Sequence, residues 1–311
     1  MSEGHNPPDG VRKSELIALA GELRPELHRY CSRLMGSVID GEDVVQDTLT
    51  KALLSYDGVR DMPTFRAWLF RVAHNRAMDL LRGRAIRAAE PIEAADNIAD
   101  DATPDPAETL MRQEAITMAV SRFTELPVLQ RSVIILKDVL DESLADIGSL
   151  LGLTVDSVKA HLARGRERLR AINAGTGRQP VARRTSEEVD RYVTLFNQRD
   201  WEGLRALLAG DVKLVQSTYP VREGATDVGM FFGIYARFEG VWLVPAWLEG
   251  REVIAVFENR TDPKPSYLMW LEWREGKISF IRDYRYVRYV VTDAELVMAP
   301  EAERERLVGD A

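Results

Sequence analysis

Hydrophobic residues in the first half of the chain recur at the spacing of amphipathic helices. Within each of three segments, apolar side chains fall three or four positions apart, which places them on one face of a helix. These segments are residues 14–36, 41–54 and 64–82. Pro25 interrupts the first segment and predicts a helix break or a new helix start, because proline cannot supply the N–H that a helix interior uses. The economical interpretation of residues 14–84 is a helical bundle.

Helical spacing returns between about residues 107 and 172 and again at 187–198 and 201–208. After Asp211 apolar and polar residues alternate with a period of two, as they do in strands that bury one face. The strand-like stretches read VKLVQSTY, REVIAVFEN, SYLMWLEWREG and KISFIRDYRYVRYVV. Glu275-Gly276, between the last two, is a hairpin signal. The last third is therefore predicted to be an α+β domain with a strongly curved antiparallel sheet.

Two changes in composition divide the chain. Residues 85–114 contain eight acidic and two basic residues and few large apolar side chains, which is typical of a linker. Residues 174–185, AGTGRQPVARRT, indicate a second tether. The predicted organisation is a helical bundle at 12–84, an acidic linker at 85–114, a second helical domain at 115–172, a tether at 173–185, an α+β domain at 186–294 and a tail at 295–311.

Composition excludes several classes of site. The chain has 311 residues, enough for two or three domains, and a net charge of −8, which excludes a uniformly basic coat but not a local basic patch. Its single cysteine, Cys31, permits no intramolecular disulfide, and its four histidines never fall at ligand spacing on one helix face, so no metal or cofactor is expected. No apolar run reaches the ~20 residues of a membrane span and no signal peptide is evident, so a cytoplasmic protein is expected.

Residues 140–170, LDESLADIGSLLGLTVDSVKAHLARGRERLR, carry the most specific local signal. A short helix ends at Gly152, a residue suited to a left-handed cap, and Thr154 caps a second helix. Two short helices joined by a tight turn describe a helix-turn-helix, whose second helix enters the major groove of DNA. A solvated charged face is the alternative interpretation. The candidate DNA-contacting residues are Ser157, Lys159, His161, Arg164, Arg166 and Arg168.

The same residues carry a family resemblance. LPVLQRSVIILKDVL together with the helix-turn-helix resembles region 4 of bacterial sigma factors, while EDVVQDTLTKAL and FRAWLFRVAHNRAMDLLR resemble region 2. Nothing between them resembles region 3. This organisation, with regions 2 and 4 alone, resembles the extracytoplasmic-function (group 4) class of the sigma-70 family. The resemblance covers about residues 12–172. It implies that residues 115–172 read the −35 promoter element and residues 12–84 the −10 element.

The resemblance also assigns roles to two helices of region 2. Core RNA polymerase, through its β′ and β subunits, is the implied partner of the polar stripe in EDVVQDTLTK. That stripe consists of Asp43, Gln46, Asp47 and Thr50. The next helix and the loop before it, residues 55–63, are implied to open the −10 element and hold the displaced strand, which requires cations and a site for an extruded base. The candidate −10 residues are Arg66, Arg71, His74, Asn75, Asp79 and Arg82.

The last third resembles the SnoaL-like, or nuclear-transport-factor-2-like, cone fold through SEEVDRYVTLFNQRDWEGLRALLAGDVKLV and its closing strands. Such cones enclose a pocket, for which Asp283, Tyr267 and Trp270 are the candidate residues. One interpretation makes Asp283 a general base with a raised pKa, as in cyclases or isomerases of this fold. The other pairs Asp283 with a neighbouring arginine on a solvent-facing strand. Fused domains of this kind imply regulation in cis, by intramolecular contact with the sigma regions.

The sequence therefore favours a sigma factor, not an enzyme, that binds core polymerase and promoter DNA. Two alternatives stay open: a helix-turn-helix regulator that works without polymerase, and a pocket enzyme fused to a DNA-binding module. The expected fold class is two all-α domains, a helical bundle and a helix-turn-helix, followed by an α+β cone with a curved antiparallel sheet.

Overall fold

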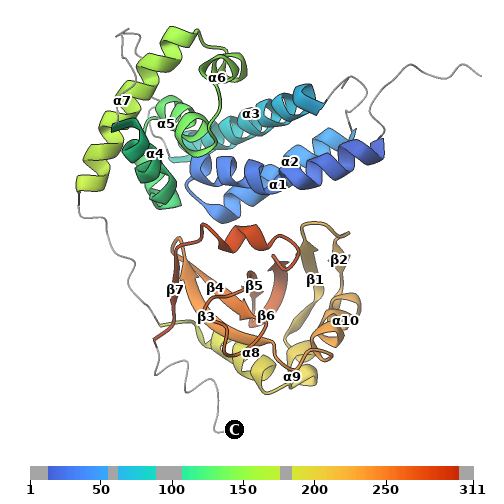
Figure 1. Ribbon diagram of the computed structural model, residues 1–311. Coiled ribbons are helices and arrows are strands. Elements are labelled where there is room, and N and C mark those ends of the chain that lie inside the picture. Colours follow the sequence, from blue (N-terminus) through green and yellow to red (C-terminus); the bar gives the residue numbers. More distant parts are fainter. Residues whose placement is uncertain (1–12, 55–61, 89–106, 176–183, 301–311) are drawn as a thin grey trace, which may run out of the picture. The chain divides into compact units, whose positions relative to one another are not determined.

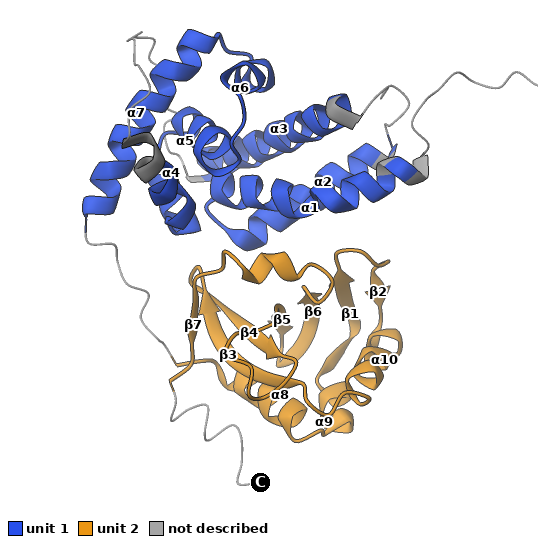
Figure 2. Ribbon diagram, viewed as in Figure 1, with its two compact units in different colours: residues 1–177 blue, residues 178–311 orange. Residues whose placement is uncertain are grey.

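The computed structural model describes residues 13–54, 62–88, 107–175 and 184–300 (Figure 1). Most of the predicted −10 loop at 55–63, and parts of the predicted linker, tether and tail, lie outside the described residues. Contacts divide the chain into two compact units, residues 1–177 (unit 1) and residues 178–311 (unit 2) (Figure 2).

Unit 1 is helical throughout its described residues. Its α1 helix runs unbroken through Pro25, so the predicted break is wrong. Leu23 and Leu27 on either side of Pro25 are buried in the core, and this packing offsets the one backbone hydrogen bond that proline removes. The elements of unit 1 are α1 (Lys13–Met35), α2 (Val38–Leu54), α3 (Met62–Ala88), α4 (Ala107–Thr117), the 3-10 helix η1 (Val120–Glu125), α5 (Val128–Ile134), the π-helical turn η2 (Ile135–Val139), α6 (Leu144–Leu151) and α7 (Val155–Ala174).

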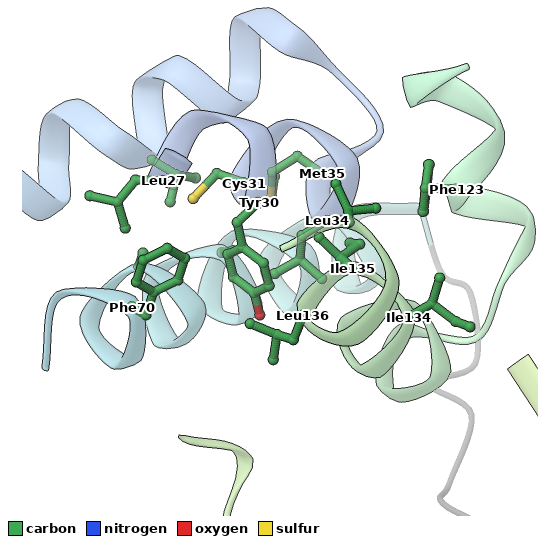
Figure 3. Close-up of a cluster of buried hydrophobic side chains, with 14 of the residues drawn as sticks. Leu27, Tyr30, Cys31, Leu34, Met35, Phe70, Phe123, Ile134, Ile135 and Leu136 are labelled. Atoms are coloured by element: carbon green, nitrogen blue, oxygen red, sulfur yellow. The ribbon is translucent and has the colours of Figure 1, made fainter. Parts of the chain in front are cut away.

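A single hydrophobic cluster joins the two helical segments of unit 1. Tyr30 of α1 lies beside Phe70 of α3, with 5.8 Å between ring centres, and Leu34 of α1 belongs to the same cluster as the buried residues 134–136 of α5 and η2 (Figure 3). A fully buried Leu or Phe side chain contributes about 1.5–3 kcal/mol, so this shared core holds the α1–α3 half against the α4–α7 half.

Arg131 of α5 adds a polar link to that core. It is buried, and its guanidinium donates to the carbonyl oxygen of Leu34 in α1 (2.7 Å) and to those of Thr124 (3.1 Å) and Leu126 (2.9 Å). Burial lowers the pKa of Arg131 to about 10, which still leaves it charged near neutral pH. One side chain therefore satisfies backbone carbonyls from both halves of unit 1.

The described residues of unit 2 combine three α-helices and one short 3-10 helix with one mixed sheet, whose strand order is β2-β1-β6-β5-β4-β3-β7. All three α-helices contribute to one core on the face of the sheet that carries Tyr267 and Met269. The elements are α8 (Glu187–Asn197), α9 (Trp201–Ala206), β1 (Leu208–Gln216), β2 (Arg222–Glu223), α10 (Ala225–Tyr235), β3 (Trp242–Leu248), β4 (Arg251–Phe257), β5 (Tyr267–Arg274), β6 (Lys277–Asp283), the 3-10 helix η3 (Arg288–Val291) and β7 (Leu296–Met298).

The expected hairpin at Glu275-Gly276 is confirmed. Both residues have positive φ, 53° and 72°, which matches the twist of the flanking strands β5 and β6. The same dipeptide, Glu249-Gly250 with φ of 54° and 80°, joins β3 to β4.

The predicted fold class, two helical domains followed by an α+β domain, is confirmed, with one correction to the sheet. β1 pairs with β6 in parallel, so the sheet is mixed, whereas all its other pairings are antiparallel. These two strands are far apart in sequence, so no tight turn forces them to run in opposite directions.

Other boundaries differ from the sequence pattern as well. The last strand-like stretch leaves the sheet after Asp283 and continues into η3. β7 lies beyond residue 294 and pairs with β3, so the sheet extends into the segment interpreted as a tail. Neither α10 nor β3 was predicted.

Candidate nucleic-acid interface

The turn between α6 and α7 has the geometry that a helix-turn-helix requires. Ser143 caps α6 by accepting from the N–H of Asp146 (3.1 Å), and Gly152 ends it with a left-handed φ of 72°. Thr154 then caps α7 by accepting from the N–H of Ser157 (3.2 Å). Local side chains and one glycine thus set the angle between the two helices, as the sequence indicated.

The second helix does not expose all of its predicted DNA-contacting residues. Arg168 is exposed, and Ser157, Lys159 and Arg164 are half-buried. His161 is buried, and its pKa is lowered, first by that burial and then by the nearby Arg164 guanidinium, which lies 3.3 Å from its Nδ1. The exposed first turn of α7 instead presents residues 154–156, which sequence reasoning did not select although N-terminal residues of a recognition helix contact bases first.

Arg166 is held by an acidic partner inside unit 1. Its guanidinium donates to both carboxylate oxygens of Asp138, which lies in η2 and is 2% exposed. This bidentate geometry orients α7 against the π-helical turn. The structure therefore gives Arg166 a packing role that the sequence pattern did not indicate.

Two of the candidate −10 cations in α3 contact the α4–α7 half. Arg66 pairs with Glu142, just before α6, and with Glu26 of α1, while its guanidinium lies 4.7 Å from the centre of the Phe70 ring. Arg71 donates to the carbonyl oxygen of Ser149 in α6 (3.2 Å). The α3 surface that resembles a −10 reader is thus partly engaged by the helix-turn-helix half.

The remaining −10 candidates divide into buried and exposed groups. His74 is half-buried, and its Nδ1 lies 2.8 Å from the hydroxyl of Tyr30. Burial, together with the Arg82 charge, lowers the pKa of His74 to about 4, so His74 is neutral near pH 7. Asn75 is exposed, and Asp79 and Arg82 form an exposed ion pair at 2.7 Å. Asn75 is therefore the candidate best placed to meet an extruded base.

The proposed polymerase-binding stripe on α2 is only partly a free surface. Asp47 and Thr50 are exposed, whereas Asp43 and Gln46 are half-buried. Gln46 accepts a hydrogen bond from Arg24 (2.7 Å), which also pairs with the buried Glu42. Asp47 pairs with Arg76 of α3 at 2.7 Å. A basic partner would therefore compete with Arg76 for Asp47.

Unit 2 contains a separate cluster of buried polar groups around Asp283. The Asp283 carboxylate is 1% exposed and accepts hydrogen bonds from the Gln216 amide (2.8 Å), the Arg285 backbone N–H (2.9 Å) and the Tyr235 hydroxyl (3.5 Å). Burial raises its pKa to about 6 against the opposing effect of these hydrogen bonds. The alternative that placed Asp283 on a solvent-facing strand is wrong.

Of the other two pocket candidates, only Tyr267 joins this cluster. Its hydroxyl lies 2.8 Å from that of Tyr235. Trp270 occupies the opposite face of β5, since side chains alternate along a strand, and stacks edge-on against Phe280 with 6.0 Å between ring centres. Tyr267 and Trp270 are three positions apart in β5, so the alternation of side chains along a strand already places them on opposite faces of the sheet.

Among the described residues, no group of three or more His, Cys, Asp or Glu side chains is placed to hold a metal ion. In the same part of the chain, no helix has the length and apolarity needed to cross a membrane.

Comparisons with known proteins agree with the helix-turn-helix geometry. Residues 19–86 match the family described as Sigma-70 region 2, and residues 119–169 match Sigma-70, region 4. The chain is 28% identical over 235 residues to the ECF RNA polymerase sigma factor SigG of Mycobacterium tuberculosis, a match that covers 68% of this chain. That match covers only 63% of SigG, so the chain spans less than two thirds of this relative.

Two further proteins are similar over different shares of the chain. The RNA polymerase sigma factor CnrH of Cupriavidus metallidurans is 33% identical over 140 residues, which cover 43% of this chain and 73% of CnrH. The solved structure of the extracytoplasmic function sigma factor SigJ of Mycobacterium tuberculosis matches with a TM-score of 0.34 and 20% identity, covering 92% of this chain and 100% of that chain. The two sequence motifs of residues 12–172 lie inside the matched segments, which confirms the resemblance drawn from them.

Proposed function

The chain belongs to the ECF RNA polymerase sigma factors of the sigma-70 family, and we propose that it directs core RNA polymerase to promoters and assists DNA opening there. The observation that carries this proposal is the helix-turn-helix of α6 and α7, at the end of a chain segment that also contains a region 2 match. In this function α7 enters the major groove of the −35 element, and Arg168 and Lys159 contact phosphates or base edges.

The exposed polar face of α3 is proposed to act at the −10 element. Asn75 can both donate and accept hydrogen bonds, which suits recognition of the edge of an extruded base. On α2, Asp47 and Thr50 form the exposed part of the polymerase-binding stripe, and the acidic Asp47 suits a basic partner such as a polymerase subunit.

Promoter binding requires the two halves of unit 1 to separate. The −35 and −10 elements lie about 25 base pairs apart, which is about 85 Å of B-form DNA. In the structure the Arg71 guanidinium of α3 lies 3.2 Å from the carbonyl oxygen of Ser149 in α6, so the two halves are in direct contact. In this arrangement they cannot bind the −10 and −35 elements at the same time. We infer that the described arrangement of unit 1 is a resting state, stabilised by Arg131 and by the pair Arg66–Glu142.

Unit 2 is proposed to be a SnoaL-like regulatory domain rather than an enzyme. Its own hydrophobic core supports an independently folded domain, and its covalent attachment keeps it at a high effective concentration near unit 1. Regulation in cis would follow if unit 2 contacts the sigma regions in one state and releases them in another.

In vitro transcription with purified core polymerase tests the proposal. Residues 1–311 and residues 1–177 are compared on promoter fragments, together with Asn75→Ala in the full chain. Initiation by both proteins with different strength supports the sigma function and the regulatory role of unit 2, and Asn75→Ala should slow opening without loss of polymerase binding.

Other results favour the alternative functions. Duplex DNA binding without initiation would replace the sigma assignment with a polymerase-independent regulator. Turnover of a small molecule by unit 2 would make the protein a DNA-binding enzyme.

A further inference from the structure

A cleft of about 440 Å³ opens in unit 2 near the Asp283 cluster. The loop 237–241 after α10 forms one wall, residues 258–259 after β4 form another, and Tyr267 and Arg285 complete the lining. A volume of this size falls in the range of small-molecule sites in proteins. The cleft lies in unit 2 alone, so it does not depend on unit 1.

Contacts within the protein hold the walls of the cleft in place before any ligand binds. The Arg199 guanidinium donates to the carbonyl oxygens of Glu239 and of Val241, the latter at 2.9 Å. These hydrogen bonds order the loop 237–241. At Gly240 a Cβ atom would lie 2.7 Å from the carbonyl oxygen of Glu258, which shows that the two walls touch there. A site whose walls are already ordered loses little entropy when it binds a ligand.

Arg285 supplies a positive charge at the cleft, and neighbouring aromatic rings hold its guanidinium in position. Its guanidinium lies 5.2 Å from the ring centres of both Tyr235 and Phe238, so stacking holds it. Its buried Nη1 atom has no hydrogen-bond partner among the described residues. Glu258, an acid that also lines the cleft, is engaged by Arg288 at 3.0 Å. The Arg285 side chain as a whole is half-buried and lines the cleft, so its positive charge can attract an anionic group of a ligand that lies there.

Tyr267 supplies an acceptor beside this cation. When Asp283 is ionised it can only accept, so the Tyr235 hydroxyl donates to it at 3.5 Å. The Tyr235 oxygen then accepts from the Tyr267 hydroxyl at 2.8 Å. The Tyr267 proton therefore points inward, and the remaining lone pair of its oxygen is the group available to a ligand in the cleft.

We propose that this cleft binds a small aromatic carboxylate that carries a hydroxyl group, with the carboxylate on Arg285 and the hydroxyl donating to the Tyr267 oxygen. The exposed Phe238 ring on the loop provides apolar surface for the aromatic part. This inference goes beyond transcription initiation and does not rest on it, because the binding needs neither polymerase nor DNA.

Calorimetric titration of the full chain, at a pH where Asp283 is ionised, tests the proposal with three probes. These are 3-hydroxybenzoate, benzoate and the neutral 3-hydroxybenzyl alcohol. We expect 3-hydroxybenzoate to bind most tightly, benzoate about fivefold more weakly for the loss of one neutral hydrogen bond, and the alcohol about tenfold or more weakly for the loss of the charge-assisted contact. No binding of 3-hydroxybenzoate up to about 10 mM, or equal binding of the alcohol, overturns the proposal.

Three variants locate the site. Arg285→Gln should weaken both acids about tenfold, while Tyr267→Phe should abolish the difference between 3-hydroxybenzoate and benzoate. Arg251→Gln is the matched control, because Arg251 also lies over an aromatic ring, that of Trp270 at 5.6 Å, but at the start of β4 and outside the cleft. Unchanged binding to Arg285→Gln, or equal loss in Arg251→Gln, contradicts the assignment. Should Arg285→Gln fail to fold, the probe series and Tyr267→Phe decide the question.

Discussion

Arg166 in α7 donates two hydrogen bonds to the carboxylate of Asp138 in η2, at 3.0 Å from Nε and 2.6 Å from Nη2. Asp138 is 2% exposed, so the pair sits at the base of the helix-turn-helix rather than on its DNA-facing side. Removing one partner of a buried pair leaves the other charged and desolvated, which costs more than the pair itself contributes.

Arg166→Ala should therefore destabilise unit 1, by about 3–5 kcal/mol, because it leaves the Asp138 carboxylate buried and unpaired. Chemical denaturation followed by circular dichroism measures this loss. Arg168→Ala is the matched control: Arg168 is exposed, so its removal should leave stability nearly unchanged while weakening −35 duplex binding by about 1–3 kcal/mol. Equal stability of the two variants would contradict the packing role of Arg166.

The pair between Arg66 and Glu142 is expected to restrain the separation of the two halves of unit 1. Glu142→Gln keeps the size of the side chain but removes its charge, so it should favour the separated state by up to about 1 kcal/mol, or about fivefold. Apparent affinity for core polymerase should rise accordingly. Glu125→Gln serves as the control, since Glu125 pairs with Arg122 inside one half. An unchanged or lower affinity in Glu142→Gln would argue against a resting state held by this contact.

Asp283 should make unit 2 less stable as pH rises. Its pKa is about 6 in the folded protein and 3.8 unperturbed, so between these values the folded state holds a proton that the unfolded state has lost. A pKa difference of about 2 corresponds to about 3 kcal/mol, which is lost as pH rises from about 4 to about 6. Asp283→Asn should flatten this dependence and be the more stable protein at pH 8. The free energy of unfolding is measured against pH for both proteins, and parallel profiles would contradict this prediction.

His74 should give unit 1 the opposite dependence. Its pKa is about 4 when folded and 6.5 unperturbed, so the stability that neutral His74 provides is present above pH 6.5 and is lost as pH falls through about 4. The Nδ1 atom that faces the Tyr30 hydroxyl can accept a hydrogen bond only while it is unprotonated. Titration of the imidazole protons by NMR should show no protonation of His74 between pH 5 and 8. A midpoint near 6.5 would show that the His74 imidazole is not shielded from solvent.

Much of the candidate site follows from local sequence. The Ser143 and Thr154 caps and the left-handed Gly152 form the predicted turn, because each depends on residues within three positions of itself. The free surface of α7 does not follow in the same way. Periodicity separates the faces of a helix, but the partner of Arg166 lies 28 residues earlier, on a π-helical turn.

In the helical bundle and in the sheet, too, local sequence does not show contacts between residues that are far apart along the chain. Nothing near Pro25 in sequence shows that distant packing keeps α1 continuous. Alternation predicts individual strands, but the parallel pairing of β1 with β6 joins residues too far apart for a turn to specify.

Spacing along the chain therefore indicated most of the helical and strand segments, the helix-turn-helix and the family, but not α10 or β3. Which polar groups remain free to act depends on contacts between distant segments. Arg66, His74 and Arg166 are engaged inside unit 1, and Asp283 is enclosed with Tyr235. Burial and ion pairing depend on which distant segments fold against a side chain, and those contacts set its charge state and its availability.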